Sequence, residues 1–277
     1  MSSTAPAAIV DETDVVYLSH DGQDLLARIY RPAGAPKAAL VDVHGGAWTG
    51  GDRLNNLAID RALAAAGFLV AAVDFRLAPG ARYPASIADS NFAVRWLKGQ
   101  AARYGFDAAK VGALGTSSGG HQMLLNAVRP LDPNFASIEP SYPQDASLAF
   151  AVAGWPIADP LARYQMAKER NLANLVRNHD SFFGDEATMA LGNPQYILDR
   201  GEQTHLPPLL ILQGTADENV SPDVARRFAD SYGKVGGRVA LEIFPDQPHA
   251  FVTKEFDNID SRRAMARIVH FVEQQIA

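Results

Sequence analysis

Short apolar runs recur along the chain and alternate with helical patterns. The runs lack strict alternation of apolar and polar residues, which is typical of strands buried on both faces of a parallel sheet. They span residues 38–43, 68–73, 110–114, 148–153, 209–212 and 239–244. The helical patterns cover residues 57–66, 87–104, 121–128, 222–235 and 261–276. This order predicts an α/β fold with a mostly parallel central sheet and helices on both of its faces.

The N-terminal region predicts an antiparallel hairpin at one edge of that sheet. Residues 15–18 and 25–30 are rich in β-forming side chains and flank Asp21-Gly22, a dipeptide typical of hairpin turns. Residues 1–13 read as a loose segment, and we expect a flexible tail there. The remaining residues, 14–277, are expected to form a single domain.

One connection is much longer than a crossover between parallel strands needs. Residues 155–208 contain an amphipathic stretch at 161–176, followed by Phe182-Phe183-Gly184. Long insertions between the last strands of a parallel sheet tend to overhang its active edge, so we expect a helical lid. The alternative is a helical decoration that only packs against the domain.

Composition narrows the class of protein. The chain has 277 residues and a net charge of −6, with no run of basic residues, so nucleic acid is not an expected partner. It has no cysteine, which excludes thiol nucleophiles. Neither a signal peptide nor an apolar stretch long enough for a membrane span is present, which predicts a cytoplasmic protein. No metal-binding motif or cofactor motif is found, and a homo-oligomer is compatible with the sequence.

The pentapeptide Gly115-Thr116-Ser117-Ser118-Gly119 lies between an apolar run and a helical pattern. A G-x-S-x-G at such a junction can form a sharp turn that exposes the serine Oγ above the sheet, as acyl transfer requires. The pattern alone occurs by chance in roughly one chain in ten of this length, so an ordinary Gly/Ser-rich loop is the alternative.

Three other loops strengthen the interpretation of Ser117 as a nucleophile. His44-Gly45-Gly46-Ala47-Trp48 follows an earlier strand, and its glycines let backbone amides turn toward a ligand. Asp217 follows a later strand as the candidate carboxylate, with its neighbour Glu218 as a rival. His249 follows the last strand as the candidate base, which completes the order Ser, Asp, His.

The remaining histidines are not expected to react. We interpret His44 as a residue that orders its loop, because the amides beside it would bind the oxyanion. His121 lies one helical turn after Ser117 and is expected to pack beneath the site.

Together these motifs resemble the hormone-sensitive-lipase-like esterases of the α/β-hydrolase superfamily. His44-Gly45-Gly46, residues 74–79, Ser117, Asp217 and His249 carry the resemblance, which covers roughly residues 15–276. The glycine motif at residues 44–48, which ends in Trp48, also resembles that of the kynurenine-formamidase and carbohydrate-esterase branches. Ala47 and Ser118 depart from the lipase-like pattern, which usually has glycine and alanine there. The resemblance implies the α/β-hydrolase fold and an oxyanion hole formed by the amides of Gly45, Gly46, Ala47 and Ser118.

The resulting prediction is a serine carboxylesterase that needs no cofactor and acts on small, short-acyl esters. Two other enzymes of this fold are alternatives: an arylformamidase and a deacetylase of acetylated carbohydrates. A third alternative is a protein of this fold that binds a ligand without catalysing a reaction. Five aromatic residues are candidates for the walls of the substrate pocket, with core packing as the alternative role: Trp48, Trp155, Phe182, Phe183 and Phe251.

Overall fold

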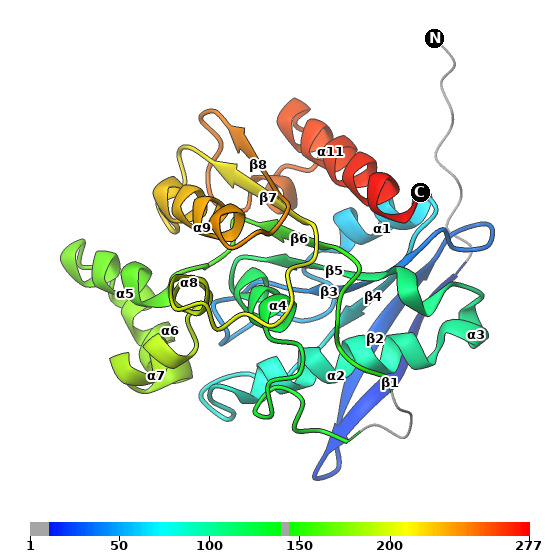
Figure 1. Cartoon of the computed structure of the whole chain (residues 1–277), viewed down its shortest axis with the longest axis horizontal. Helices are drawn as coiled ribbons and strands as arrows, with labels where there is room; N and C mark the ends of the chain where they lie inside the picture. The colour runs from blue at the N-terminus through cyan, green and yellow to red at the C-terminus, as the bar shows by residue number, and fades with distance from the viewer. Residues whose placement is uncertain (1–10, 140–143) are drawn as a thin grey trace.

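A single eight-stranded sheet runs through the molecule (Figure 1). The computed structural model describes residues 11–139 and 144–277. Strands β1 and β2 form an antiparallel hairpin, β2 pairs antiparallel with β4, and all later neighbours are parallel in the order β1-β2-β4-β3-β5-β6-β7-β8. The strand bounds are β1 Asp11–His20, β2 Gln23–Arg31, β3 Ala39–Val43, β4 Leu69–Val73, β5 Val111–Thr116, β6 Ala151–Gly154, β7 Leu209–Gly214 and β8 Val239–Phe244.

Helices cover both faces of the sheet, as the apolar strands require. One face packs against α2 (Ala85–Gly99), α4 (Ser118–Val128) and α9 (Pro222–Lys234). The opposite face packs against α1 (Leu57–Ala65) and the C-terminal pair α10 (Phe251–Lys254) and α11 (Ile259–Ile276). Alternate residues of the strands enter the two cores, since Val41 and Ala113 belong to the first and Leu40 and Leu114 to the second. The predicted fold class is confirmed.

The insertion between β6 and β7 contains four helices. They are α5 (Pro160–Glu169), α6 (Ala173–Phe183), α7 (Glu186–Leu191) and α8 (Pro194–Asp199), and α5 to α7 lie together at one end of the molecule in Figure 1. The amphipathic stretch at 161–176 was expected to be continuous, but the chain turns between α5 and α6. Asn171 has φ 55° there, a left-handed conformation that asparagine tolerates and that interrupts a helix.

Two predicted boundaries were wrong. Residues 11–13 were assigned to the tail, but β1 begins at Asp11 because its pairing with β2 continues to Asp11 opposite Arg31. The rest of the predicted tail, residues 1–10, lies outside the described residues. The helical pattern at 87–104 is divided at Gln100 into α2 and the short α3 (Ala101–Tyr104).

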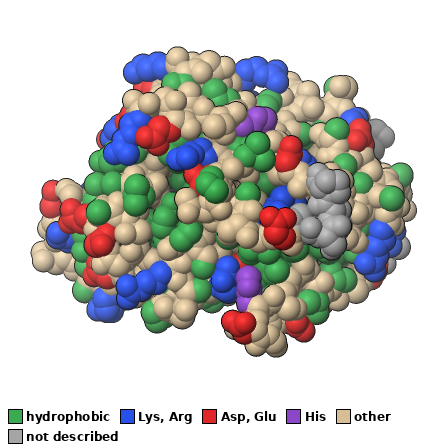
Figure 2. Space-filling view, turned by 60° about the horizontal axis from the view of Figure 1, so that its bottom comes forward, with side chains coloured by type: hydrophobic (Ala, Val, Ile, Leu, Met, Phe, Trp, Pro, Cys, Tyr) green, Lys and Arg blue, Asp and Glu red, His purple; other side chains and the backbone are tan. Residues whose placement is uncertain are grey.

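The surface carries both acidic and basic side chains, as expected from the 31 acidic and 25 basic residues of the sequence. On the face shown in Figure 2, acidic and basic side chains are interspersed rather than gathered in separate patches. Over the two described ranges, no helix combines the length and the hydropathy needed to cross a membrane.

Candidate active site

Ser117 occupies a sharp turn between β5 and α4. Its backbone has φ 53° and ψ −117°, a strained conformation for a residue with a side chain. The Ser117 amide donates to the Gly154 carbonyl at 2.9 Å, and the Ser117 carbonyl accepts from the amides of His121 and Ile157. These bonds hold the turn, and Ser117 as a whole residue is 9% exposed. The geometry matches the nucleophile elbow that the pentapeptide predicts.

Small residues make this turn sterically feasible. A Cβ at Gly115 would lie 2.6 Å from the Gly119 carbonyl oxygen, and a Cβ at Gly119 would collide with the Val43 carbonyl. Strands β3 and β5 and the start of α4 therefore meet with no room for a methyl group at either position. This close approach fixes the position of the Ser117 Cα relative to the sheet.

Three side chains from separate strand ends form one hydrogen-bonded chain. The Ser117 Oγ lies 3.0 Å from Nε2 of His249, which follows β8. The His249 Nδ1 lies 2.8 Å from Oδ2 of Asp217, which follows β7. The loops that carry Asp217 and His249 are joined by the Ala216 amide, which donates to the Gln247 carbonyl at 3.1 Å.

The Asp217 carboxylate is held in a fixed orientation. Its Oδ1 accepts from the amides of Asn219 and Val220 at 2.8 Å each, and its Oδ2 also accepts from Nε2 of Gln213 at 3.1 Å. Burial alone raises the pKa of Asp217, but the hydrogen bond and charge of His249 and the two amides outweigh it and lower the pKa below its ordinary value. Asp217 therefore stays ionised at neutral pH. The rival Glu218 lies instead at the wall of an outer cavity.

The glycine loop after β3 approaches the serine closely. Gly46, Ala47 and Trp48 have φ values of 123°, 52° and 62°, so successive backbone groups turn through the left-handed region. A Cβ at Gly45 would lie 3.2 Å from the Ser117 Cβ. The Trp48 amide donates to the Ser118 Oγ at 3.2 Å, which joins this loop to the start of α4.

The amides predicted to form an oxyanion hole are free to donate. Within the described ranges, the amides of Gly46, Ala47 and Ser118 donate no hydrogen bond to the protein. Ser118 is the first residue of α4, where an amide has no partner inside the helix. Gly45, Gly46 and Ala47 line the same cavity as Ser117 and His249. Such amides can stabilise a developing negative charge.

The cavity at Ser117 has a volume of about 390 Å³ and differs from the one we expected. Of the five predicted aromatic walls, Trp155 lines it, with its ring 6.4 Å from that of His249. The other four predictions were wrong, because these side chains pack in the cores without lining the cavity: Trp48, Phe182, Phe183 and Phe251.

Trp48 instead joins the domain to the insertion. Its ring stacks on Phe182 of α6 with a centroid distance of 5.0 Å, and its Nε1 donates to Nδ1 of His121 at 3.1 Å. The opposite nitrogen of His121, Nε2, lies 2.7 Å from the Gly192 carbonyl, to which it donates. This pair of bonds requires a neutral imidazole, and burial lowers the pKa of His121 to about 4. His44 is also buried, with its Nδ1 2.6 Å from the Gly45 carbonyl.

Sequence reasoning missed Arg163 and Asn219. Arg163 of α5 lines the cavity at Ser117, and its guanidinium donates to the backbone carbonyl and the Oδ1 of Asn219. The sequence held one signal for Arg163: it is an arginine on the same helix face as Pro160 and Ala167, which are buried. Asn219 is two residues from Asp217 but belongs to no motif.

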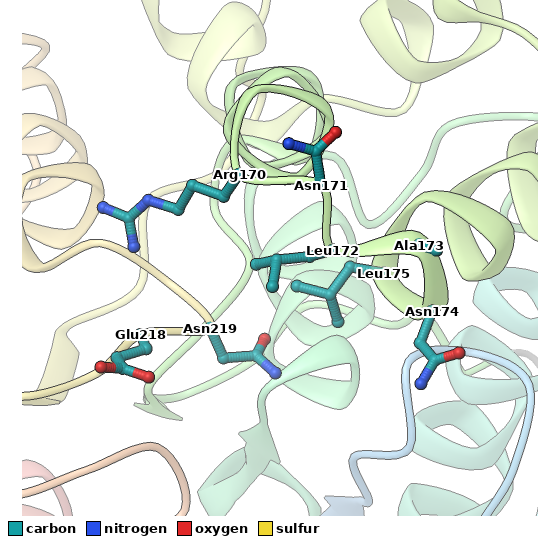
Figure 3. A pocket seen from close by; sticks show the side chains of 8 residues that line it. All are labelled: Arg170, Asn171, Leu172, Ala173, Asn174, Leu175, Glu218 and Asn219. Atoms are coloured by element: carbon teal, nitrogen blue, oxygen red, sulfur yellow. The ribbon is translucent and has the colours of Figure 1, made fainter.

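An outer cavity of about 720 Å³ adjoins the first and shares Leu175 and Asn219 with it. Figure 3 shows that the chain between α5 and α6 forms one side of this cavity, while Glu218 and Asn219 face it from the Asp217 loop. The insertion therefore contributes to the walls of both cavities.

Comparison with known proteins identifies the family of this chain. The BD-FAE family model matches residues 28–232. The probable carboxylic ester hydrolase LipM of Mycobacterium tuberculosis is 30% identical over 244 residues, which cover 86% of this chain and 53% of LipM. The carboxylesterase NlhH of the same organism is 29% identical, with 89% of this chain and 76% of NlhH covered. The chain thus spans about half the length of LipM and of a second relative, the esterase LipC.

Among solved structures, the thermophilic esterase Est2 of Thermogutta terrifontis is similar over nearly the whole chain. Its propionate-bound and butyrate-bound structures are 25% identical and cover 95% of this chain and 94% of Est2, with TM-scores of 0.78 and 0.79. The predicted resemblance to α/β-hydrolase esterases is confirmed. This chain therefore belongs to the BD-FAE family and has the α/β-hydrolase fold.

Proposed function

We propose that this chain is a carboxylic ester hydrolase that acts on small esters through Ser117, His249 and Asp217. The observation that carries the proposal is the continuous hydrogen-bonded chain from the Ser117 Oγ through both nitrogens of His249 to the buried Asp217 carboxylate. The esterase names of the relatives support the reaction class, and the propionate and butyrate bound to Est2 support a short acyl group.

The reaction begins with attack of the Ser117 Oγ on the ester carbonyl carbon. His249 Nε2 takes the serine proton, and Asp217 stabilises the imidazolium. The amides of Gly46, Ala47 and Ser118, with Gly45 beside them, are proposed to bind the oxyanion. When the tetrahedral intermediate collapses, His249 gives its proton to the departing alcohol and an acyl-enzyme remains.

Water completes the cycle by the same route. His249 removes a proton from a water molecule, whose oxygen attacks the acyl carbon, and the proton then returns to the Ser117 Oγ as the carboxylic acid leaves. Because the backbone amides are already oriented before the reaction, they need little reorganisation to bind the oxyanion. Loss of one such donor typically lowers kcat by about 100- to 1000-fold.

Labelling with a fluorophosphonate probe tests the nucleophile directly. We expect the native protein to be labelled and to hydrolyse 4-nitrophenyl acetate, whereas Ser117→Ala does neither while it keeps the native melting temperature. Absence of labelling in folded native protein would favour the noncatalytic ligand-binding alternative. Equal turnover by Ser117→Ala would exclude Ser117 as the nucleophile.

A substrate panel separates the alternatives within this fold. Esters from acetyl to decanoyl, N-formylkynurenine and acetylated xylan should be compared by kcat/KM, and we expect the short-chain esters to rank first. The role of residues 155–208 as a lid, the homo-oligomer and the cytoplasmic location stay predictions.

A further inference from the structure

The cavity at Ser117 is lined by groups that donate hydrogen bonds. Its described lining contains no aspartate and no glutamate, although the whole chain has a net charge of −6. The cationic side chain in this wall is Arg163, and His249 is the other group that can carry a positive charge. The polarity of the wall is therefore opposite to the net charge of the protein.

Three asparagine side chains in the wall have their carbonyl oxygens already occupied. The Asn55 Oδ1 accepts from the Asp52 amide at 3.2 Å, and the Asn178 Oδ1 accepts from the Thr49 Oγ1 at 3.3 Å. The Asn219 Oδ1 accepts from Nε of Arg163 at 3.1 Å. Across the described parts of the chain, the Nδ2 groups of these three asparagines donate no hydrogen bond to the protein. Each asparagine can therefore offer a ligand an N–H group.

Arg163 is a buried cation without a carboxylate partner among the described residues. The residue is 3% exposed. Its guanidinium donates hydrogen bonds to Asn219 and makes a longer contact of 3.5 Å from Nη1 to Nε2 of His179. Burial lowers the pKa of Arg163 to about 10, so the guanidinium is still protonated at neutral pH. The carboxylate of Asp217 acts on it only at a distance and is bonded to His249 and the amides of its own loop.

Burial of a cation without a close counter-charge is unfavourable, and a bound anion relieves that cost. A guanidinium has five N–H donors in one plane, which suit the planar geometry of a carboxylate. We propose that Arg163 and the asparagine donors form a subsite for a carboxylate group of the substrate, so that the preferred esters are anionic. This proposal rests on the proposed esterase function and names its substrate class.

Two pairs of esters of matched shape test the proposal. Monoethyl succinate carries a carboxylate on the acyl side, and ethyl levulinate replaces that carboxylate with a neutral acetyl group. Acetoxyacetate carries the carboxylate on the alcohol side, and acetoxyacetone is its neutral counterpart. Hydrolysis of all four is followed by acid release at constant pH 7.5, with 4-nitrophenyl acetate as a reference ester.

For the wild-type protein we expect kcat/KM to be at least about 10-fold higher for the anionic member of one pair, which also shows on which side the carboxylate lies. In Arg163→Gln this ratio should fall by about 10- to 100-fold, the range of a charge-assisted hydrogen bond. Arg163→Lys should recover part of the ratio because it keeps the charge. Arg226→Gln makes the same charge change on the exposed face of α9, where Arg226 pairs with Asp223, and should keep the wild-type ratio.

The outcomes separate this proposal from the proposed function. Hydrolysis of 4-nitrophenyl acetate with a preference for the neutral ester in both pairs would overturn the carboxylate subsite and leave the esterase function standing. An equal loss for anionic and neutral esters in Arg163→Gln would make Arg163 a positioning residue for Asn219 and Asp217 only. No hydrolysis of any ester by folded wild-type protein would overturn the esterase function and the subsite together. The wild-type comparison needs no variant, so it holds even if Arg163→Gln does not fold.

Discussion

A methyl group added at Gly115 tests the packing beneath the serine. In Gly115→Ala the new Cβ would lie 2.6 Å from the Gly119 carbonyl oxygen, 2.8 Å from its carbon and 2.9 Å from the Gly120 nitrogen. Ordinary contact begins at 3.4 Å, so β5 and the start of α4 must separate by about 0.8 Å at the closest atom. All three atoms belong to the backbone, so no side chain can rotate to make room.

The same displacement should affect stability and turnover. Overpacking of this kind costs about 1–3 kcal/mol, which lowers the melting temperature of a chain of this size by roughly 2–12 °C. Ser117 lies between the two elements that must separate, and its Oγ is 3.0 Å from Nε2 of His249. A misplacement near 1 Å can cost about 100-fold in rate, so we expect kcat to fall by roughly 30- to 100-fold.

Thermal denaturation and the kinetics of 4-nitrophenyl butyrate hydrolysis measure both effects. Gly34→Ala is the matched control, because a Cβ at Gly34 meets no atom within 4 Å and its φ is not in the left-handed region. This control should match the wild type in both assays. If Gly115→Ala behaved like Gly34→Ala, the close approach of β5 and α4 would not be what positions Ser117.

Three further variants, one of them with a matched control variant, test other parts of the site and the core. Asp217→Asn should lower kcat for 4-nitrophenyl butyrate by about 10,000-fold, because an amide does not hold His249 in the tautomer that the reaction requires. The control variant Glu218→Gln should have the kcat of the wild type in the same assay. Ser118→Ala removes the hydroxyl that accepts a hydrogen bond from the buried Trp48 amide. Urea denaturation should show that the free energy of unfolding falls by about 1–3 kcal/mol. Unchanged stability would contradict this role of the Ser118 hydroxyl. Asp60 is fully buried, and neither carboxyl oxygen has a hydrogen-bond partner in the described chain, so burial, with the nearby Asp42 charge, raises its pKa well above the ordinary value. A raised pKa means that folding takes up a proton at Asp60, so the contribution of Asp60 to stability should fall by up to about 1.4 kcal/mol per pH unit as the pH rises above roughly 4. Asp60→Asn should therefore remove this contribution from the pH profile of stability, and parallel curves for the two proteins would refute the assignment.

The sequence predicted the sheet well because its signals are local. Apolar runs without alternation located β3 to β8, and Asp21-Gly22 located the hairpin turn between β1 and β2. The errors lie where tertiary contacts override the local pattern. Pairing with β2 extends β1 back to Asp11, and a left-handed Asn171 divides the amphipathic stretch of the insertion.

The candidate site was predictable where a residue follows a strand in a known order. Ser117, Asp217 and His249 lie at the carboxyl ends of β5, β7 and β8, and those ends meet at one edge of a parallel sheet. Hydrophobicity alone cannot distinguish a cavity wall from a core, so Trp48 and Phe182 were wrongly expected at the cavity. Arg163 was missed because its position depends on how the insertion folds over the sheet edge, which no local pattern records.

The stacking of Trp48 on Phe182 has a consequence for protein engineering. Insertions between strands of this fold invite the construction of chimeras, in which one specificity segment replaces another. Here a replaced insertion would leave the Trp48 ring without its partner and the His121 imidazole without the Gly192 carbonyl. A functional chimera of this chain would therefore have to exchange the glycine loop and the insertion together.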